Sequence, residues 1–163
     1  MNVLLRDPVK TDFVVLAALR NDSSVQRQLM IESTKYNADQ VRSWVRRRTG
    51  DPKGTFMVVD FDGPCGFVQL TQIDLKTGSG DLGICLINSA RGKGIAEIAM
   101  IQLEKRAMEK YRCKKFTLRV LRINHRAISF YKKLKYKLIE IKRRHHFDGS
   151  HWRDVIFMEK PLR

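Results

Sequence analysis

The chain has 163 residues, of which 43% are hydrophobic and 30% are charged, a balance typical of a folded globular domain. Its 32 lysines and arginines outnumber 17 acidic residues and give a net charge of +15, which favours anionic partners. No apolar run approaches the roughly 20 residues of a membrane span, and the three cysteines lack the spacing of a metal site, so we expect a cytoplasmic protein with reduced thiols, no metal and no membrane partner.

The first fifty residues predict one short strand followed by three helices. Phe13, Leu16 and Ala17 recur on one face of the first helix, as an amphipathic helix requires. Asp22 and Asn37 are residue types that cap helix N-termini, and each precedes a further helical pattern. The elements predicted here are a strand over 3–6 and helices over 10–20, 22–30 and 37–50.

From residue 55 onwards the pattern changes to short apolar runs, separated by turn residues. Ile95, Ala99, Leu103 and Ala107 recur every four residues and mark the longest helix. The predicted elements are strands over 55–60, 65–73 and 81–87, a helix over 92–111, a strand over 115–121, a helix over 126–133, and strands over 136–144 and 153–158. This order predicts a mixed α+β fold, with a single domain over residues 1–163 because no linker divides the chain.

The stretch "SARGKGIAE" predicts an anion site where a strand meets the longest helix. A helix N-terminus exposes unpaired N–H groups and the positive end of the helix dipole. Gly92 and Gly94 let a ligand approach the backbone closely, and Arg91 and Lys93 add positive charge. The stretch matches neither a Walker loop nor GxGxxG, and glycines also occur at ordinary strand–helix turns. The residue types therefore suit a phosphate or pyrophosphate group without specifying which ligand carries it.

A second motif, "NHRAISFYKKLKY", follows the next predicted strand, and the two motifs together indicate a more specific ligand than the first does alone. Arg91, Gly94 and Ala96 fit the pattern [Arg/Gln]-x-x-Gly-x-[Gly/Ala], and Asn124 and Tyr131 stand in the second motif. Together they resemble the GNAT superfamily of acyl-CoA-dependent N-acetyltransferases. The resemblance implies a mixed, mostly antiparallel sheet of about seven strands, flanked by helices and splayed between the fourth and fifth strands. It also implies acetyl-CoA as the co-substrate.

The resemblance assigns roles to individual residues. The strand that ends before the pyrophosphate loop would contact the pantetheine arm from one side and Asn124 from the other. Tyr131 would donate a proton to the leaving thiolate. The alternative for Tyr131 is packing beside Phe130 in the core. The pyrophosphate loop would consist of Arg91, Gly92, Lys93, Gly94, Ile95 and Ala96. The end of the strand before it would consist of Leu86 and Ile87.

Two features of the motif region stay open in the sequence. The family usually has glycine where Lys135 stands, so a left-handed residue there would cost about 1 kcal/mol. The general base has no clear signature, and Asp81 and Asp74 are the acidic candidates near the central strands.

The resemblance implies a small-molecule or peptide amine as the acceptor, and the N-terminal helices are expected to hold it. Segments such as "ALRNDSSVQRQLM" resemble a branch that acetylates nucleotide-linked amino sugars, which implies Arg20, Asn21 and Arg27 as acceptor-binding residues. Two alternatives fit the basic charge: acetylation of protein N-termini such as those of ribosomal proteins, and a non-catalytic module that binds nucleic acid or ribosomes. Either a monomer or a homodimer is compatible with the sequence.

Overall fold

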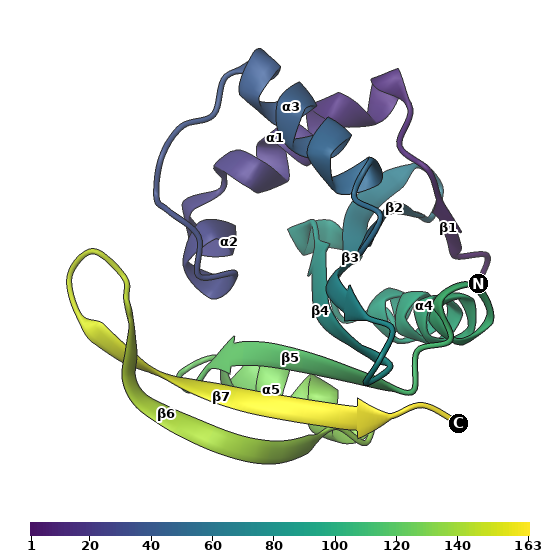
Figure 1. Ribbon diagram of the computed structural model, residues 1–163. Helices are drawn as coiled ribbons and strands as arrows, with labels where there is room; N and C mark the ends of the chain where they lie inside the picture. The colour runs from purple at the N-terminus through teal and green to yellow at the C-terminus, as the bar shows by residue number, and fades with distance from the viewer.

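The computed structural model describes all 163 residues and contains one mixed sheet with the strand order β1-β2-β3-β4-β5-β7-β6 (Figure 1). Every neighbouring pair is antiparallel except β4 and β5, which run parallel. The predicted α+β fold with a seven-stranded, mostly antiparallel sheet is therefore confirmed. The strands are β1 (Leu4–Arg6), β2 (Thr55–Asp60), β3 (Pro64–Asp74), β4 (Ser79–Leu86), β5 (Lys115–Leu121), β6 (Lys137–Phe147) and β7 (Trp152–Pro161).

Five α-helices accompany the sheet, and their starts follow the capping residues read from the sequence. Asp22 accepts a hydrogen bond from the Val25 N–H, and Asn37 forms a reciprocal capping box with Gln40. The longest helix starts at residue 95 and not at the predicted 92, because Gly92 has a left-handed φ of 75°. The helices are α1 (Phe13–Asn21), α2 (Ser23–Gln28), α3 (Ala38–Thr49), α4 (Ile95–Tyr111) and α5 (His125–Lys133), and short 3₁₀ turns cover Lys10–Asp12 and Asn88–Ala90.

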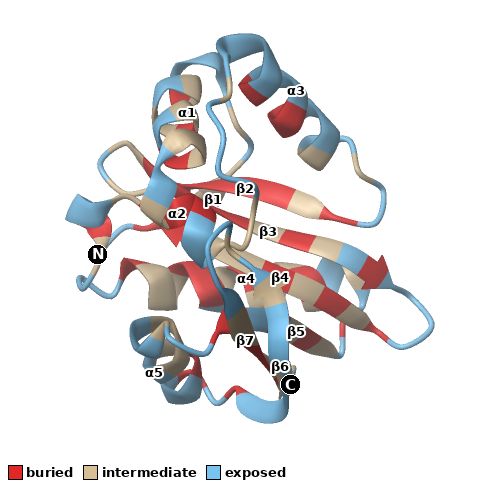
Figure 2. Cartoon of the chain, turned by 90° about the vertical axis from the view of Figure 1, so that its left-hand side faces the viewer, coloured by how far each residue is buried: buried red, intermediate tan, exposed pale blue.

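Helices cover both faces of the sheet, and alternate strand residues feed two separate cores. Phe56 and Val58 of β2 face α1–α3, whereas Met57 and Val59 face the layer of α4. Figure 2 shows the buried residues as red segments along β2, β3 and β4. On the α1–α3 side, the Trp44 ring meets the rings of Phe56 and Phe67 edge-on at 5.2 and 5.4 Å.

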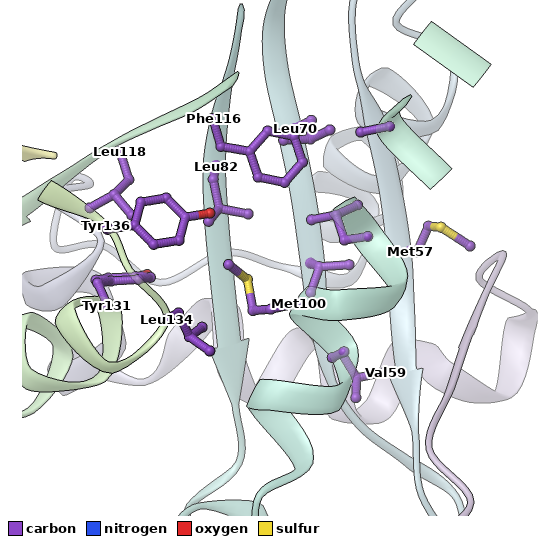
Figure 3. Close-up of a cluster of buried hydrophobic side chains, with 14 of the residues drawn as sticks. Met57, Val59, Leu70, Leu82, Met100, Phe116, Leu118, Tyr131, Leu134 and Tyr136 are labelled. Atoms are coloured by element: carbon purple, nitrogen blue, oxygen red, sulfur yellow. The ribbon is translucent and has the colours of Figure 1, made fainter. Parts of the chain in front are cut away.

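The second core joins α4 and α5 to the sheet. Met100 of α4 and Phe116 of β5 are fully buried in it (Figure 3). Lys135, after α5, has a left-handed conformation with a φ of 72°. The turn therefore carries the strain expected of a non-glycine residue at that position.

None of the helices combines the length and hydrophobicity that a bilayer-spanning segment needs.

The sheet opens between β4 and β5, as predicted. Their parallel pairing covers only Ser79–Asp81 against Lys115–Thr117. β4 continues to Leu86 and β5 to Leu121 without pairing with each other. The inner edges of both strands are thereby left without a neighbouring strand over the rest of their length. This opening positions the candidate site.

Candidate active site

A cavity of about 510 Å³ occupies the opening and reaches both faces of the sheet. On one face it is lined by residues of α1, α2 and α3, and on the other by the start of α4 and by α5. The two sides meet at the splayed part of β4. A ligand can therefore enter from one face, and its reactive end can meet a second molecule from the other face.

The turn before α4 offers six consecutive unpaired backbone donors. None of the N–H groups from Gly92 to Glu97 donates a hydrogen bond within the chain. Gly92 and Gly94 have φ values of 75° and 79°, and a Cβ at either position would have no atom within 4 Å. The turn is an open cradle of donors at the positive end of a 17-residue helix. This arrangement suits a pyrophosphate group.

The side chains of this turn have different roles. Arg91 donates from Nε to the Leu86 carbonyl oxygen at 2.9 Å, which fastens the turn to the end of β4. Lys93 is exposed, and Ala96 lines the cavity. Ile95 is 1% exposed in the core, so it can offer a ligand only its backbone N–H. The predicted loop therefore provides donors mainly through its backbone.

The pairing of β4 with β3 decides which backbone groups face the opening. The Ile87 N–H donates to the Cys65 carbonyl at 2.9 Å, so this group is committed to the sheet. Residues alternate in an antiparallel ladder, so Ile84 and Leu86 direct their N–H and C=O groups away from β3, towards the opening. Of the predicted pair Leu86 and Ile87, only Leu86 has its N–H available. The sequence did not point to Ile84, because the register between β3 and β4 decides which residues of β4 face the opening.

Tyr131 both packs in the core and reaches the cavity. It is 8% exposed, and its ring lies 5.4 Å from that of Phe130. The ring of Tyr136 lies 5.5 Å away on the core side (Figure 3). Its hydroxyl makes no hydrogen bond within the chain, and the residue lines the cavity. Burial raises the pKa of Tyr131 well above its usual value, and nearby Cys85 and Asp81 act in the same direction. The phenol is therefore protonated at neutral pH and can donate.

Asn124 begins α5 at the same cavity. Its Oδ1 accepts a hydrogen bond from the Ala127 N–H at 3.2 Å, which caps the helix. The side-chain amide nitrogen makes no hydrogen bond within the chain. The residue can therefore cap α5 and still donate to a ligand. Arg126, which the sequence reasoning did not select, also lines the cavity and has no acidic partner.

The structure separates the two acidic candidates for a general base. Asp74 lies in an exposed turn, where N–H donors beginning with that of Lys76 lower its pKa. Asp81 lines the cavity at the point where β4 and β5 part. Burial raises the pKa of Asp81, and Arg119, 3.2 Å away, opposes this rise. Of these two candidates, only Asp81 lines the cavity, where it can take a proton from a bound molecule.

Of the three predicted acceptor residues, only Arg20 lines the cavity. Arg27 is exposed on α2 and does not line the cavity. Asn21 does not line the cavity either, and its amide bonds the backbone: Nδ2 donates to the Tyr36 carbonyl at 3.0 Å, and Oδ1 accepts from the Tyr36 N–H at 2.7 Å. Asn21 therefore holds the loop before α3 and does not face a ligand.

A sheet splayed beside a free helix N-terminus, with a phenol inside the opening, defines a class of acyl-CoA-dependent transferases. The chain belongs to the GNAT acetyltransferase domain family, whose pattern it matches over residues 2–137. It is therefore an N-acetyltransferase with acetyl-CoA as co-substrate. None of the curated proteins compared matches it in sequence.

Several solved structures share the fold at low sequence identity. Spermidine N-acetyltransferase from Vibrio cholerae, in complex with CoA and spermine, is 19% identical, with a TM-score of 0.89 over 98% of this chain and 95% of that one. An N-acetyltransferase from Staphylococcus aureus Mu50 is 20% identical, with a TM-score of 0.84 and full coverage of both chains. The Microcin C7 self-immunity acetyltransferase MccE, in complex with acetyl-CoA and AMP, is 16% identical, with a TM-score of 0.85 over 98% and 92%.

Proposed function

We propose that residues 1–163 form a single domain that transfers the acetyl group of acetyl-CoA to a primary amine on a nucleotide-linked amino sugar. The observation that carries the proposal is the run of six free N–H groups, Gly92 to Glu97, at one end of a cavity that crosses the sheet. A pyrophosphate bound there would direct the rest of the co-substrate along the free edge of β4. The amine would approach from the side of α1–α3.

The residues inside the opening suit a direct attack on the thioester. Acetyl-CoA supplies an acetyl thioester, whose carbon the amine attacks and whose thiolate leaves. The free N–H groups of Ile84 and Leu86 can stabilise negative charge on the carbonyl oxygen. Tyr131 holds a proton at its hydroxyl and donates to the leaving sulfur, and Asp81 is the base that accepts a proton from the incoming ammonium group.

The charge of the cavity supports a nucleotide-linked acceptor. Six cationic side chains line it (Arg20, Arg48, Arg91, Arg119, Arg126 and Lys133) against two carboxylates (Asp81 and Glu97). Both carboxylates are already paired, Asp81 with Arg119 and Glu97 with Lys133 at 2.6 Å. Among the similar structures, one holds the polycation spermine and another holds AMP. A cavity with excess positive charge suits a nucleotide better than a polyamine.

A stability screen tests the proposed class of activity. The melting temperature would be measured with acetyl-CoA, with desulfo-CoA and with a short RNA. A ligand at 100 times its Kd stabilises the native state by about 2.7 kcal/mol, so both CoA compounds should raise the melting temperature. Stabilisation by RNA alone would support the non-catalytic binding module instead. A panel of amines, assayed by thiol release, then separates amino sugars from peptide N-termini.

A further inference from the structure

The side chain of Arg20 is held in the cavity without an anionic partner. Its guanidinium carbon lies 4.5 Å from the centre of the Tyr36 ring and 4.8 Å from that of Trp44. Nε is buried and makes no hydrogen bond, and no carboxylate forms an ion pair with the group. Burial lowers the pKa of Arg20, although arginine remains charged at any physiological pH. The aromatic rings orient a cation that has no carboxylate partner.

The surrounding structure fixes this arrangement in place. Gln26, which is 2% exposed, donates from Nε2 to the Arg20 carbonyl at 2.9 Å and to the Thr34 carbonyl at 2.7 Å. The two bonds from Asn21 to the Tyr36 backbone hold the same loop. The Tyr36 ring is thus kept beside Arg20 by buried polar contacts and not by chance packing.

A second free arginine lies close by. Arg48, in the last turn of α3, lines the same cavity, has no ion pair and follows Trp44, whose ring contacts Arg20, by four residues on one face of the helix. The positive charges of Arg48 and Arg47 both contribute to lowering the pKa of Arg20, so the group is in a repulsive surrounding that an anion would relieve. The only carboxylates that line the cavity are engaged elsewhere.

The co-substrate does not account for these two arginines. The turn before α4 and Arg126 of α5 line the cavity from the face of α4 and α5. Arg20 and Arg48 belong to α1 and α3, which pack on the opposite face through the core of Trp44 and Phe67. They therefore lie where the acceptor would enter.

We infer that Arg20 and Arg48 form a subsite for an anionic group of the acceptor, so that the enzyme selects amines carrying a phosphate or carboxylate and rejects polyamines. The inference rests on the proposed function and deepens it by naming the residues that recognise the anionic part of the acceptor. Guanidinium groups bind phosphate and carboxylate through two parallel N–H bonds, which fixes the orientation of the acceptor as well as its affinity. A polyamine would bring further positive charge towards Arg20 and Arg48 and would meet no free carboxylate.

Binding to the CoA-saturated protein tests the inference without requiring the natural acceptor. Saturation with CoA fills the anion site before α4, and inorganic pyrophosphate, malonate or spermidine is then titrated by calorimetry. We expect pyrophosphate or malonate to bind, and whichever binds more tightly identifies phosphate or carboxylate as the group that is recognised. Spermidine should not bind.

Three variants locate the binding. Arg20→Met and Arg48→Met should each weaken anion binding about 30-fold or more, as removal of one partner of a desolvated charge pair does. Arg46→Met, on the exposed side of α3, removes the same charge and should have little effect. All three variants should keep the wild-type affinity for CoA, and the melting temperature shows whether each is folded.

The outcomes separate this inference from the proposed function. Failure of CoA to bind the wild type would overturn the proposed function itself. Normal CoA binding with no anion binding, with equal losses in all three variants, or with tight spermidine binding would overturn the subsite alone. Arg48→Met provides the decisive comparison if Arg20→Met fails to fold.

Discussion

The two ends of the cavity are built in different ways. The end proposed to bind the co-substrate is a backbone feature: six N–H groups contributed by one continuous turn and the first residues of α4. The end proposed to bind the acceptor consists of side chains brought together from α1, the loop before α3 and α3 itself, as Arg20, Tyr36 and Arg48 show. A backbone cradle tolerates changes in most side chains, whereas an assembly of side chains changes specificity with a single substitution. The comparison explains how one fold can keep its co-substrate while its acceptor varies.

The largest effect is expected at the co-substrate end. Gly94→Glu should abolish stabilisation by acetyl-CoA, because a carboxylate in the cradle would occupy the space for the pyrophosphate and repel it. Residue 94 has a φ of 79°, so the variant also carries about 1–2 kcal/mol of backbone strain. Thermal unfolding with increasing acetyl-CoA measures the loss.

Gly149→Glu is the matched control for this experiment. Gly149 lies in the turn between β6 and β7 with a φ of 94° and nothing within 4 Å of an added Cβ. It therefore adds comparable strain and the same charge away from the cavity, and it should keep full stabilisation by acetyl-CoA. An equal loss in both variants would show that strain, and not the cradle, causes the effect.

The next largest effect concerns the reaction between the two ends. Tyr131→Phe should lower kcat by about 10²–10⁴-fold, the usual range for general acid catalysis, with little change in acetyl-CoA affinity. The ring remains, so packing beside Phe130 should persist. Tyr136→Phe is the control: the Tyr136 hydroxyl is buried without a partner, so its removal should leave activity intact and stability unchanged or higher. If kcat is unchanged in Tyr131→Phe while the chemical step limits the rate, Tyr131 is not the general acid and serves only to pack the core.

A smaller effect, visible mainly as a change in pH dependence, is expected at Asp81. Burial raises the pKa of Asp81, so the wild-type rate should fall as the pH drops through that value and the base becomes protonated. Asp81→Asn should lower the rate at neutral pH by about 10-fold or more and remove this acidic limb. Stability should change little, because the partly exposed pair with Arg119 contributes little. A variant that keeps the wild-type pH–rate profile would exclude Asp81 as the base.

The smallest effect tests the support of the acceptor end. Gln26→Leu leaves the carbonyls of Arg20 and Thr34 without a donor, so it should destabilise by about 1–3 kcal/mol and raise the acceptor KM several-fold. Gln102→Leu is the control, because that amide also bridges two backbone groups, at Val3 and Leu5, far from the acceptor. Both variants should lose stability, and only Gln26→Leu should change KM. Equal KM values would contradict a positioning role for the loop.

The fold and the co-substrate end could be predicted from the sequence because their signals are local. A helix cap such as Asn37, and a pair of glycines before an apolar helix, specify conformation within a few residues. The acceptor end could not be predicted in this way. Arg48 directly follows Arg46 and Arg47 in the sequence, and only the packing of α3 brings it to the cavity while Arg46 and Arg47 stay exposed. Asn21 and Arg27 lie close to Arg20 in sequence, yet helix geometry directs them elsewhere.

Backbone amide hydrogen exchange, with and without acetyl-CoA, tests the central claim most directly. The N–H groups from Gly92 to Glu97 have no acceptor within the chain, so they should exchange rapidly in the free protein. Acetyl-CoA should slow their exchange strongly, together with that of Ile84 and Leu86, while the turn at Gly149 stays unchanged. Protection elsewhere, with no change over residues 92–97 in a protein that acetyl-CoA nevertheless stabilises, would contradict a backbone cradle for the co-substrate.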